Sequence, residues 1–320
     1  MKDERFVNLD EHLRTIDLKR KGKLKMGQTI GVEPFDKHIQ LKKGELTVIA
    51  GHANAGKTTV ILWYMLVNTV KNDTRWLVYS SENDAWILID KLIAMKLQQH
   101  TEDVSDMEFY KARDYILDHF RFVDDTKTYT AYDLLQLARD IKDEWDYQAL
   151  LLDPYNSIAK DRKMYAELGG HEYDYRVLGD IRIFCKQTGI AVYINAHGVT
   201  EALRKVHTRG DEYMGYDLEG HPRPLAQADI EGGSKFSSRA DNFWCVHRYT
   251  RHESLYNYTL IHVNKVKVTE TGGAPTFFND PVRLQMRMGG TFLIDDRYDP
   301  LGKTSRTEEI IITSNEDDIF

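Results

Sequence analysis

The nine residues from 51 to 59 constrain the fold of this chain more than any other feature. They read GHANAGKTT and match the pattern G-x-x-x-x-G-K-T. The apolar residues 46–50 before them read as a buried strand, and the apolar residues 60–66 after them read as a helix. This strand–loop–helix order is the context that a phosphate-binding P-loop requires, and it argues against a chance glycine turn before Lys57 and Thr58.

The P-loop predicts which residues surround a bound nucleotide. Small residues allow backbone N–H groups to point at the phosphates, and the following helix adds the positive end of its dipole. Lys57 would reach the β- and γ-phosphates, and the Thr58 hydroxyl would bind Mg²⁺. We therefore expect ATP or another nucleoside triphosphate, together with Mg²⁺. The expected nucleotide-binding residues are Gly51, Asn54, Ala55, Gly56, Lys57, Thr58 and Thr59.

Length and composition narrow the class of protein. The chain has 320 residues, of which 42% are hydrophobic, so one sizeable core with insertions is expected. It has no run of about 18 apolar residues and no apolar signal segment at its start, so we expect no membrane span and a cytoplasmic location. Its two cysteines make neither a disulfide framework nor a zinc ribbon. The net charge of −7 argues against a wholly basic nucleic-acid-binding surface but permits a local basic channel.

Apolar runs and helical periodicities alternate along the chain after the P-loop strand. We predict strands over residues 46–50, 76–80, 121–123, 149–153 and 191–196, and helices over residues 58–70, 85–99, 105–119, 131–144 and 172–188. This alternation predicts an α/β fold with a largely parallel central sheet flanked by helices. Further on, residues 199–234 read as a long functional loop, 242–248 and 258–263 as strands, and 265–275 as a turn.

Two carboxylates lie at the ends of predicted strands. Glu82 follows the second strand, and Asp153 closes the apolar run of the fourth. The carboxyl ends of parallel strands beside a P-loop are where a water-activating base and a Mg²⁺-holding carboxylate belong. We predict Glu82 as the catalytic base and Asp153 as a Mg²⁺ ligand, directly or through water. The competing interpretations are a helix-initiating turn from Ser81 to Asp84 and a strand-capping role for Asp153.

A histidine closes the fifth predicted strand. His197 ends the run IAVYINAH. At this strand end it could contact the γ-phosphate, or relay the loss of that phosphate to a neighbouring loop. The alternative is a hydrogen-bonded structural histidine, and only its position favours the catalytic role.

These features together resemble the RecA-like motor domain of hexameric replicative helicases, the family of bacterial DnaB, mitochondrial Twinkle and phage primase–helicases. The resemblance covers about residues 29–295. Residues 31–37 (GVEPFDK) resemble the family's lead-in segment, and residues 41–51 (LKKGELTVIAG) are close to its GLxxGELTVIAG. Residues 232–241 (GGSKFSSRAD) resemble the Twinkle segment GSAKASQEAD. Glu82 then matches the catalytic glutamate, Asp153 the Walker B carboxylate and His197 the switch residue.

The resemblance implies an ATP-driven 5′–3′ DNA helicase that works as a homo-oligomeric, hexameric ring on single-stranded DNA. A loop around residues 223–231 would face the channel and bind DNA phosphates, and the implied DNA-binding residues are Arg223, Gly232, Gly233 and Lys235. Arg248 falls where phage members place an arginine that packs on the adenine. Lys265 and Lys267 align with the catalytic element that reaches the neighbouring subunit's ATP site.

The chain departs from the family pattern at two places. Lys267 stands where an arginine finger is expected, and a lysine lacks the planar fork of arginine, so Arg251 or Arg283 could act instead. Residues 200–225 form an enlarged segment. It is either a DNA-binding loop that uses Arg204, Lys205 and Arg209 or a disordered surface insertion.

The resemblance also implies three regions. Residues 1–28 would form a linker with a short amphipathic helix that docks on a neighbouring subunit, residues 29–300 the RecA-like ATPase domain, and residues 301–320 an acidic tail. The tail ends in Ile-Phe and could bind replication proteins such as a polymerase, a primase or a single-strand binding protein, or it could be a solubilising terminus. A phage-encoded chain would work in the host cytoplasm.

Two other functions fit the same core. One is a filament-forming recombinase, and the other is a regulatory ATPase of the circadian-clock type whose hydrolysis is indifferent to DNA. The shape of the assembly would separate the first from a ring helicase, and a DNA-dependent hydrolysis rate would separate the second.

Overall fold

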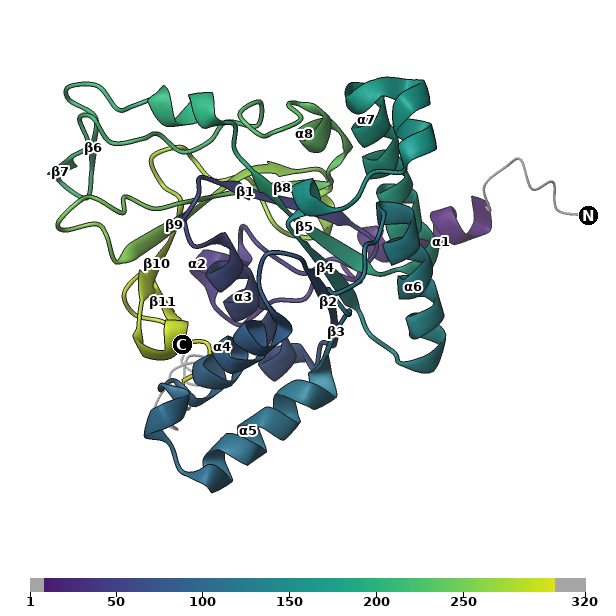
Figure 1. Cartoon of the computed structure of the whole chain (residues 1–320), viewed down its shortest axis with the longest axis horizontal. Helices are drawn as coiled ribbons and strands as arrows, with labels where there is room; N and C mark the ends of the chain where they lie inside the picture. The colour runs from purple at the N-terminus through teal and green to yellow at the C-terminus, as the bar shows by residue number, and fades with distance from the viewer. Residues whose placement is uncertain (1–8, 303–320) are drawn as a thin grey trace, which may run out of the picture.

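A nine-stranded sheet forms the centre of the structure, a computed structural model that describes residues 9–302 (Figure 1). The strands lie in the order β11-β10-β9-β8-β1-β5-β4-β2-β3. Their bounds are β1 Leu46–Gly51, β2 Trp76–Ser80, β3 Phe120–Phe122, β4 Ala149–Asp153, β5 Ala191–His197, β8 Asn242–His247, β9 Tyr258–Val266, β10 Val282–Met286 and β11 Phe292–Ile294. The six strands from β8 to β3 run parallel, and β9, β10 and β11 extend the sheet antiparallel.

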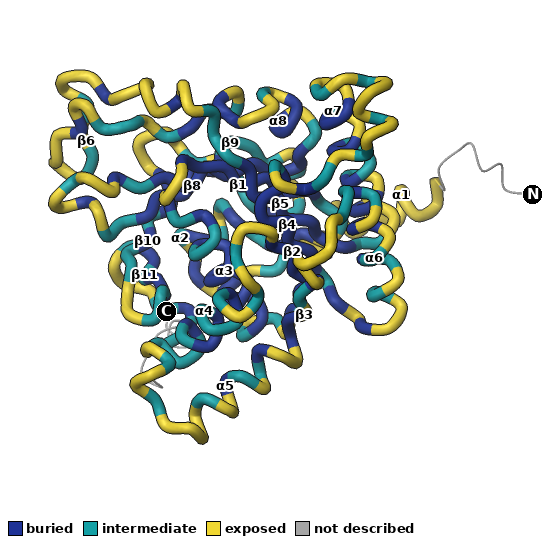
Figure 2. Tube along the Cα trace, in the orientation of Figure 1, coloured by how far each residue is buried: buried dark blue, intermediate teal, exposed yellow. Residues whose placement is uncertain are grey.

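Helices cover both faces of this sheet. On one face lie α3 (Lys57–Asn72), α4 (Ala85–Leu97) and α5 (Asp106–His119), together with the short α2 (Glu33–Asp36). On the other lie α6 (Ala131–Glu144), α7 (Arg162–Thr188) and α8 (Lys235–Arg239). The inner strands of the sheet are buried along their whole length, as Figure 2 shows, because helices exclude water from both faces.

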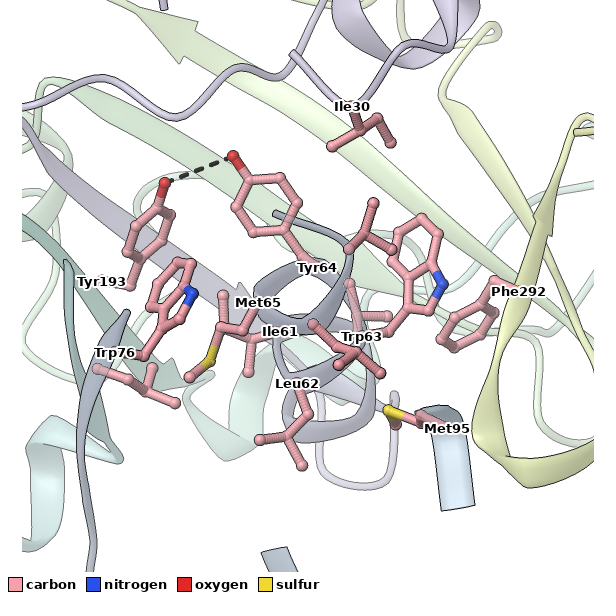
Figure 3. Close-up of a cluster of buried hydrophobic side chains, with 14 of the residues drawn as sticks. Ile30, Ile61, Leu62, Trp63, Tyr64, Met65, Trp76, Met95, Tyr193 and Phe292 are labelled. Atoms are coloured by element: carbon pink, nitrogen blue, oxygen red, sulfur yellow. Dashed lines mark hydrogen bonds between the residues drawn. The ribbon is translucent and has the colours of Figure 1, made fainter. Parts of the chain in front are cut away.

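The helix after the P-loop is apolar on all sides because it lies between the sheet and further elements. Figure 3 shows Trp63 beside Phe292 of β11, with ring centroids 5.5 Å apart and the rings nearly perpendicular. On another side of α3, the Tyr64 hydroxyl lies 3.5 Å from that of Tyr193 in β5. A fully buried helix of this kind fixes the position of the P-loop at its N-terminus.

The lead-in segment packs against the same helix. Asp36 at the end of α2 accepts hydrogen bonds from the backbone N–H groups of Ile30 and Val32, both 2.8 Å long. Phe35 is buried, and its ring lies 5.8 Å from that of Trp63, edge to face. This segment therefore completes the core beside α3.

The predicted α/β fold is confirmed, and each predicted strand and helix of residues 46–197 has a counterpart. Differences lie mainly at the ends. The last helix begins at Arg162 instead of residue 172 and is interrupted at Gly169, where φ is 73°. Strands β10 and β11 and helix α8 were missed. In β10 the alternation of buried Val282 and Leu284 with more exposed Arg283 was an available signal for a strand.

The enlarged segment of residues 199–234 is folded against the sheet, in contrast to the surface insertion considered above. It contains a 3₁₀ turn, Thr200–Arg204, and the two-residue strands β6 (Glu212–Tyr213) and β7 (Tyr216–Asp217). Leu218 packs with Tyr249, Leu255 and Leu260 in a small core of its own beside β8 and β9. This packing was not predictable from the polar, glycine-containing composition of the segment.

The N-terminal region provides one helix, α1 (Leu9–Arg20), that lies apart from the core (Figure 1). Its side chains are all exposed, including the apolar Leu9, Leu13 and Ile16. The acidic tail predicted over residues 301–320 lies almost wholly outside the described residues. Within residues 9–302, no helix is long and apolar enough to cross a membrane.

Candidate functional site

The P-loop adopts the bend that its glycines predict. Asn54 and Gly56 have φ values of 61° and 88°, and α3 begins at the next residue, Lys57. Gly51 has no room for a side chain, because a Cβ there would lie 2.4 Å from the carbonyl oxygen of Val246. The close approach of β1 and β8 therefore requires glycine at the first position of the motif.

The Lys57 side chain is buried beneath this loop. Its ammonium donates to the carbonyl oxygens of Gly51 at 3.0 Å and His52 at 3.1 Å. Burial lowers the pKa of Lys57, and the negative charges of Asp153 and Glu82 partly oppose this. An ammonium held only by carbonyl oxygens in a low-dielectric setting is suited to receive an anionic phosphate.

The two predicted Mg²⁺ ligands are in direct contact. The Thr58 hydroxyl donates to Asp153 Oδ2 at 3.0 Å, and the amide of Asn195 donates to Asp153 Oδ1 at 2.8 Å. Burial raises the pKa of the Asp153 carboxyl, although both hydrogen bonds oppose the shift. A buried carboxylate beside a hydroxyl is a hard oxygen donor pair that fits Mg²⁺.

This pair alone does not make a resident metal site. Among the residues described, no three His, Cys, Asp or Glu side chains are grouped so as to hold a metal ion. Mg²⁺ would therefore bind through Thr58 and Asp153 together with the phosphates of a nucleotide, which supply the remaining oxygens.

Glu82 and His197 lie together at the same edge of the sheet. His197 Nε2 is 3.0 Å from Glu82 Oε1, and both side chains are partly open to solvent. Strand register explains the meeting: Gly51 pairs with His197 between β1 and β5, and Ser80 pairs with Asp153 between β2 and β4. Four predicted residues from distant parts of the sequence thus converge with the P-loop on one strand edge.

The end of β5 is also tied to the segment that follows it. The backbone N–H of Glu231 donates to the His197 carbonyl at 2.9 Å. The Asn156 side chain accepts from the His197 N–H at 3.3 Å and donates to Glu231 Oε2 at 2.8 Å. A displacement of His197 would therefore be transmitted directly to residues around 231.

The four predicted DNA-binding residues differ in their surroundings. Arg223 is exposed, and its guanidinium lies 2.9 Å from Asp211. Gly232 is exposed and Gly233 half-buried, both with positive φ. Lys235 differs from the expectation of a free cation. It is 5% exposed and its ammonium lies 3.3 Å from Asp174, so it cannot reach a DNA phosphate without breaking this buried ion pair.

The lysines expected to act on a neighbouring subunit also differ from each other. The Lys265 ammonium donates to the carbonyl oxygens of Ser237 and Ala240 at 2.6 and 2.7 Å, and so is engaged within its own chain. Lys267 is 44% exposed and lies 3.7 Å from Asp241. Of the two, Lys267 has the side chain that is free to reach outwards.

The alternative arginines and Arg248 lie on the far side of the P-loop from Glu82. Arg248 and Arg251 line a cavity of 660 Å³ together with P-loop residues 52–55. Arg248 Nε donates to the carbonyl of Tyr256 at 2.5 Å. Arg283 is half-buried and paired with Asp296 at 3.1 Å. The cavity is therefore the part of the structure where a nucleobase next to the P-loop has space.

Sequence reasoning missed three polar residues of this site. Asn195 holds Asp153, Asn156 bridges His197 and Glu231, and His52 donates or accepts a hydrogen bond of 3.0 Å at the Arg223 carbonyl. Asn195 could have been found as a polar residue in an otherwise apolar strand. The other two depend on partners more than 70 residues away, which no local pattern reveals.

Comparisons with known proteins agree with this architecture. By sequence, the chain matches no protein-family profile and no curated protein. By structure, it is similar to the ATPase domain of a DnaB-like helicase, with a TM-score of 0.69 and 15% identity over 90% of this chain and 99% of that one. It is also similar to a DnaB-like replicative helicase that was solved to study its interactions with primase. That match has a TM-score of 0.68 and 16% identity over 92% of this chain and 68% of the other. The chain therefore has the RecA-like fold, and its whole described body resembles the ATPase domains of DnaB-like replicative helicases.

Proposed function

We propose that this protein is an ATP-driven motor that moves along single-stranded DNA and works as a replicative helicase, with 5′–3′ direction by resemblance. One observation supports this above all. The P-loop lysine, a Thr58–Asp153 pair and a Glu82–His197 pair meet at the carboxyl edge of one parallel sheet. This arrangement provides phosphate binding, Mg²⁺ binding and a water-activating base in one place.

Each residue has a distinct task in the proposed hydrolysis. Lys57 would leave the carbonyls of Gly51 and His52 for the β- and γ-phosphates, and Mg²⁺ bound by Thr58 and Asp153 would neutralise developing negative charge. Glu82 would accept a proton from the attacking water. His197 would orient Glu82 through their present hydrogen bond and respond to the loss of the γ-phosphate.

The proposed site is completed by a neighbouring copy of the chain. Lys267 is the best candidate for the cation that enters from that copy, because Lys265 is engaged by two carbonyls of its own subunit. The exposed apolar side chains Leu9 and Leu13 of α1 would dock on the adjacent subunit and hold a ring together. The tail of residues 314–320 would be free to bind replication partners.

DNA would contact the segment that leads from Arg223 to Gly233. Exposed Arg223 offers a phosphate-binding cation, and Gly232 and Gly233 allow the backbone to approach the strand closely. Affinity based on phosphate contacts falls steeply with salt and shows little base preference. Lys235 would then support the loop through Asp174 rather than bind the strand itself.

The test is the ATPase rate with and without a single-stranded oligonucleotide, measured alongside the size of the assembly. We expect hydrolysis stimulated by DNA, a closed ring, and loss of hydrolysis in Lys57→Ala. Exposed Lys127→Ala, a matched lysine far from the P-loop in sequence, serves as the control. A filament would favour the recombinase, and full activity of a dilute monomer that ignores DNA would refute the motor.

A further inference from the structure

The second residue of the P-loop motif connects the nucleotide site to the predicted DNA-binding segment. His52 follows Gly51 directly and is 8% exposed. Its Nε2 lies 3.0 Å from the carbonyl oxygen of Arg223, which is 171 residues away in the sequence. Because a carbonyl oxygen can only accept, His52 carries the proton on Nε2 and donates it.

The Lys57 ammonium binds the other side of His52. In the arrangement described here, Lys57 donates to the main-chain carbonyl of His52 at 3.1 Å. A nucleotide would draw this ammonium to its phosphates, because a charge-assisted bond to a phosphate is stronger than a bond to a carbonyl. Nucleotide binding would therefore release one side of His52 while its ring still holds Arg223.

The segment on the Arg223 side is stiff enough to transmit such a change. The Arg223 N–H donates to the Lys205 carbonyl at 2.8 Å, and its guanidinium lies 2.9 Å from Asp211. Asp211 is 3.2 Å from His207, whose other ring nitrogen lies 3.1 Å from the Tyr249 hydroxyl. A shift of the Arg223 backbone would move a connected group of side chains and not one flexible loop tip.

We propose that His52 is a positioning residue that couples nucleotide occupancy to the affinity for single-stranded DNA through its hydrogen bond to the Arg223 main chain. The inference rests on the proposed function and adds to it a second route. The first route passes through His197 to Glu231, and the second leaves the P-loop on the β8 side of the sheet. Two connections to one segment constrain both of its ends.

The experiment measures the dissociation constant of a fluorescent oligothymidine by anisotropy, with and without Mg²⁺ and a non-hydrolysable ATP analogue. The ratio of the two constants reports the coupling, which for linked sites typically lies between about 5- and 150-fold. We expect His52→Ala to bring this ratio to within about twofold of one. His52→Gln, whose amide can donate to the same carbonyl, is expected to restore most of it.

Two further variants separate coupling from general effects. His100→Ala removes an exposed histidine elsewhere in the fold and should leave the ratio unchanged. Arg223→Gln keeps the carbonyl but removes the guanidinium, so it should weaken DNA binding in both states and preserve the ratio. Thermal unfolding of each variant verifies that the fold persists.

The outcomes distinguish the two levels of the proposal. A wild-type ratio that His52→Ala leaves intact would overturn the role of His52 and leave the motor function standing. An unfolded His52→Ala would shift the decision to His52→Gln, whose ratio must then match the wild type. A wild-type protein that binds no oligothymidine under any condition would overturn the motor function itself.

Discussion

The acid sensitivity of the fold depends on His262, a residue of β9 that is 5% exposed. Its Nε2 has no hydrogen-bond partner among the described residues. Burial, helped by the nearby positive charge of His207 when that residue is protonated, lowers the pKa of His262 from 6.5 to about 4. The unfolded chain therefore binds a proton at this position below about pH 6.5, while the folded chain does not until about pH 4.

The magnitude follows from the difference between these two pKa values. Stability is intact above pH 6.5, falls as the pH drops, and reaches its full loss below about pH 4. A difference of about 2.5 in pKa, at about 1.4 kcal/mol each, corresponds to on the order of 3 kcal/mol. Between pH 6.5 and 5 the slope attributable to His262 is about 1.4 kcal/mol per pH unit.

Urea unfolding of His262→Gln and the wild type over pH 7.5 to 4.5 measures this slope. The variant has lost the titrating group, so its free energy of unfolding should fall less steeply with acid by about one proton's worth. Comparing slopes removes any constant cost of burying the glutamine. Exposed His100→Gln should keep the wild-type slope. An unchanged slope in His262→Gln would refute the assignment of this acid sensitivity to burial of His262.

Two other substitutions test the site and the packing beneath it. Glu82→Gln should lower the hydrolysis rate by about 10²–10⁴-fold while nucleotide binding persists, because the amide keeps the shape but cannot accept the proton; a loss below tenfold in single-turnover assays would exclude Glu82 as the base. Gly51→Ala should destabilise the fold, because its Cβ would lie 2.4 Å from the Val246 carbonyl oxygen and a backbone atom has to move. A melting temperature equal to that of the wild type would show that β1 and β8 can separate at no cost.

Local sequence patterns were sufficient for the parts of the fold that repeat a simple periodicity. The alternation of buried strands with amphipathic helices after residue 46 predicted the parallel half of the sheet. It failed for the antiparallel extension, where β11 has only three residues and its burial depends on Trp63 of α3. Short strands carry too few residues for a period to be recognised.

The identity of the chemical residues was determined by the sequence, because the P-loop spacing and the strand-end carboxylates depend only on near neighbours in the chain. Their states were decided by the tertiary structure. Lys235 and Lys267 are both lysines that follow turn residues. Only the packed fold buries the first against Asp174 and leaves the second exposed. In the same way, only strand register brings Glu82 to His197, since the energy of a buried or paired charge is set by groups that are distant in sequence.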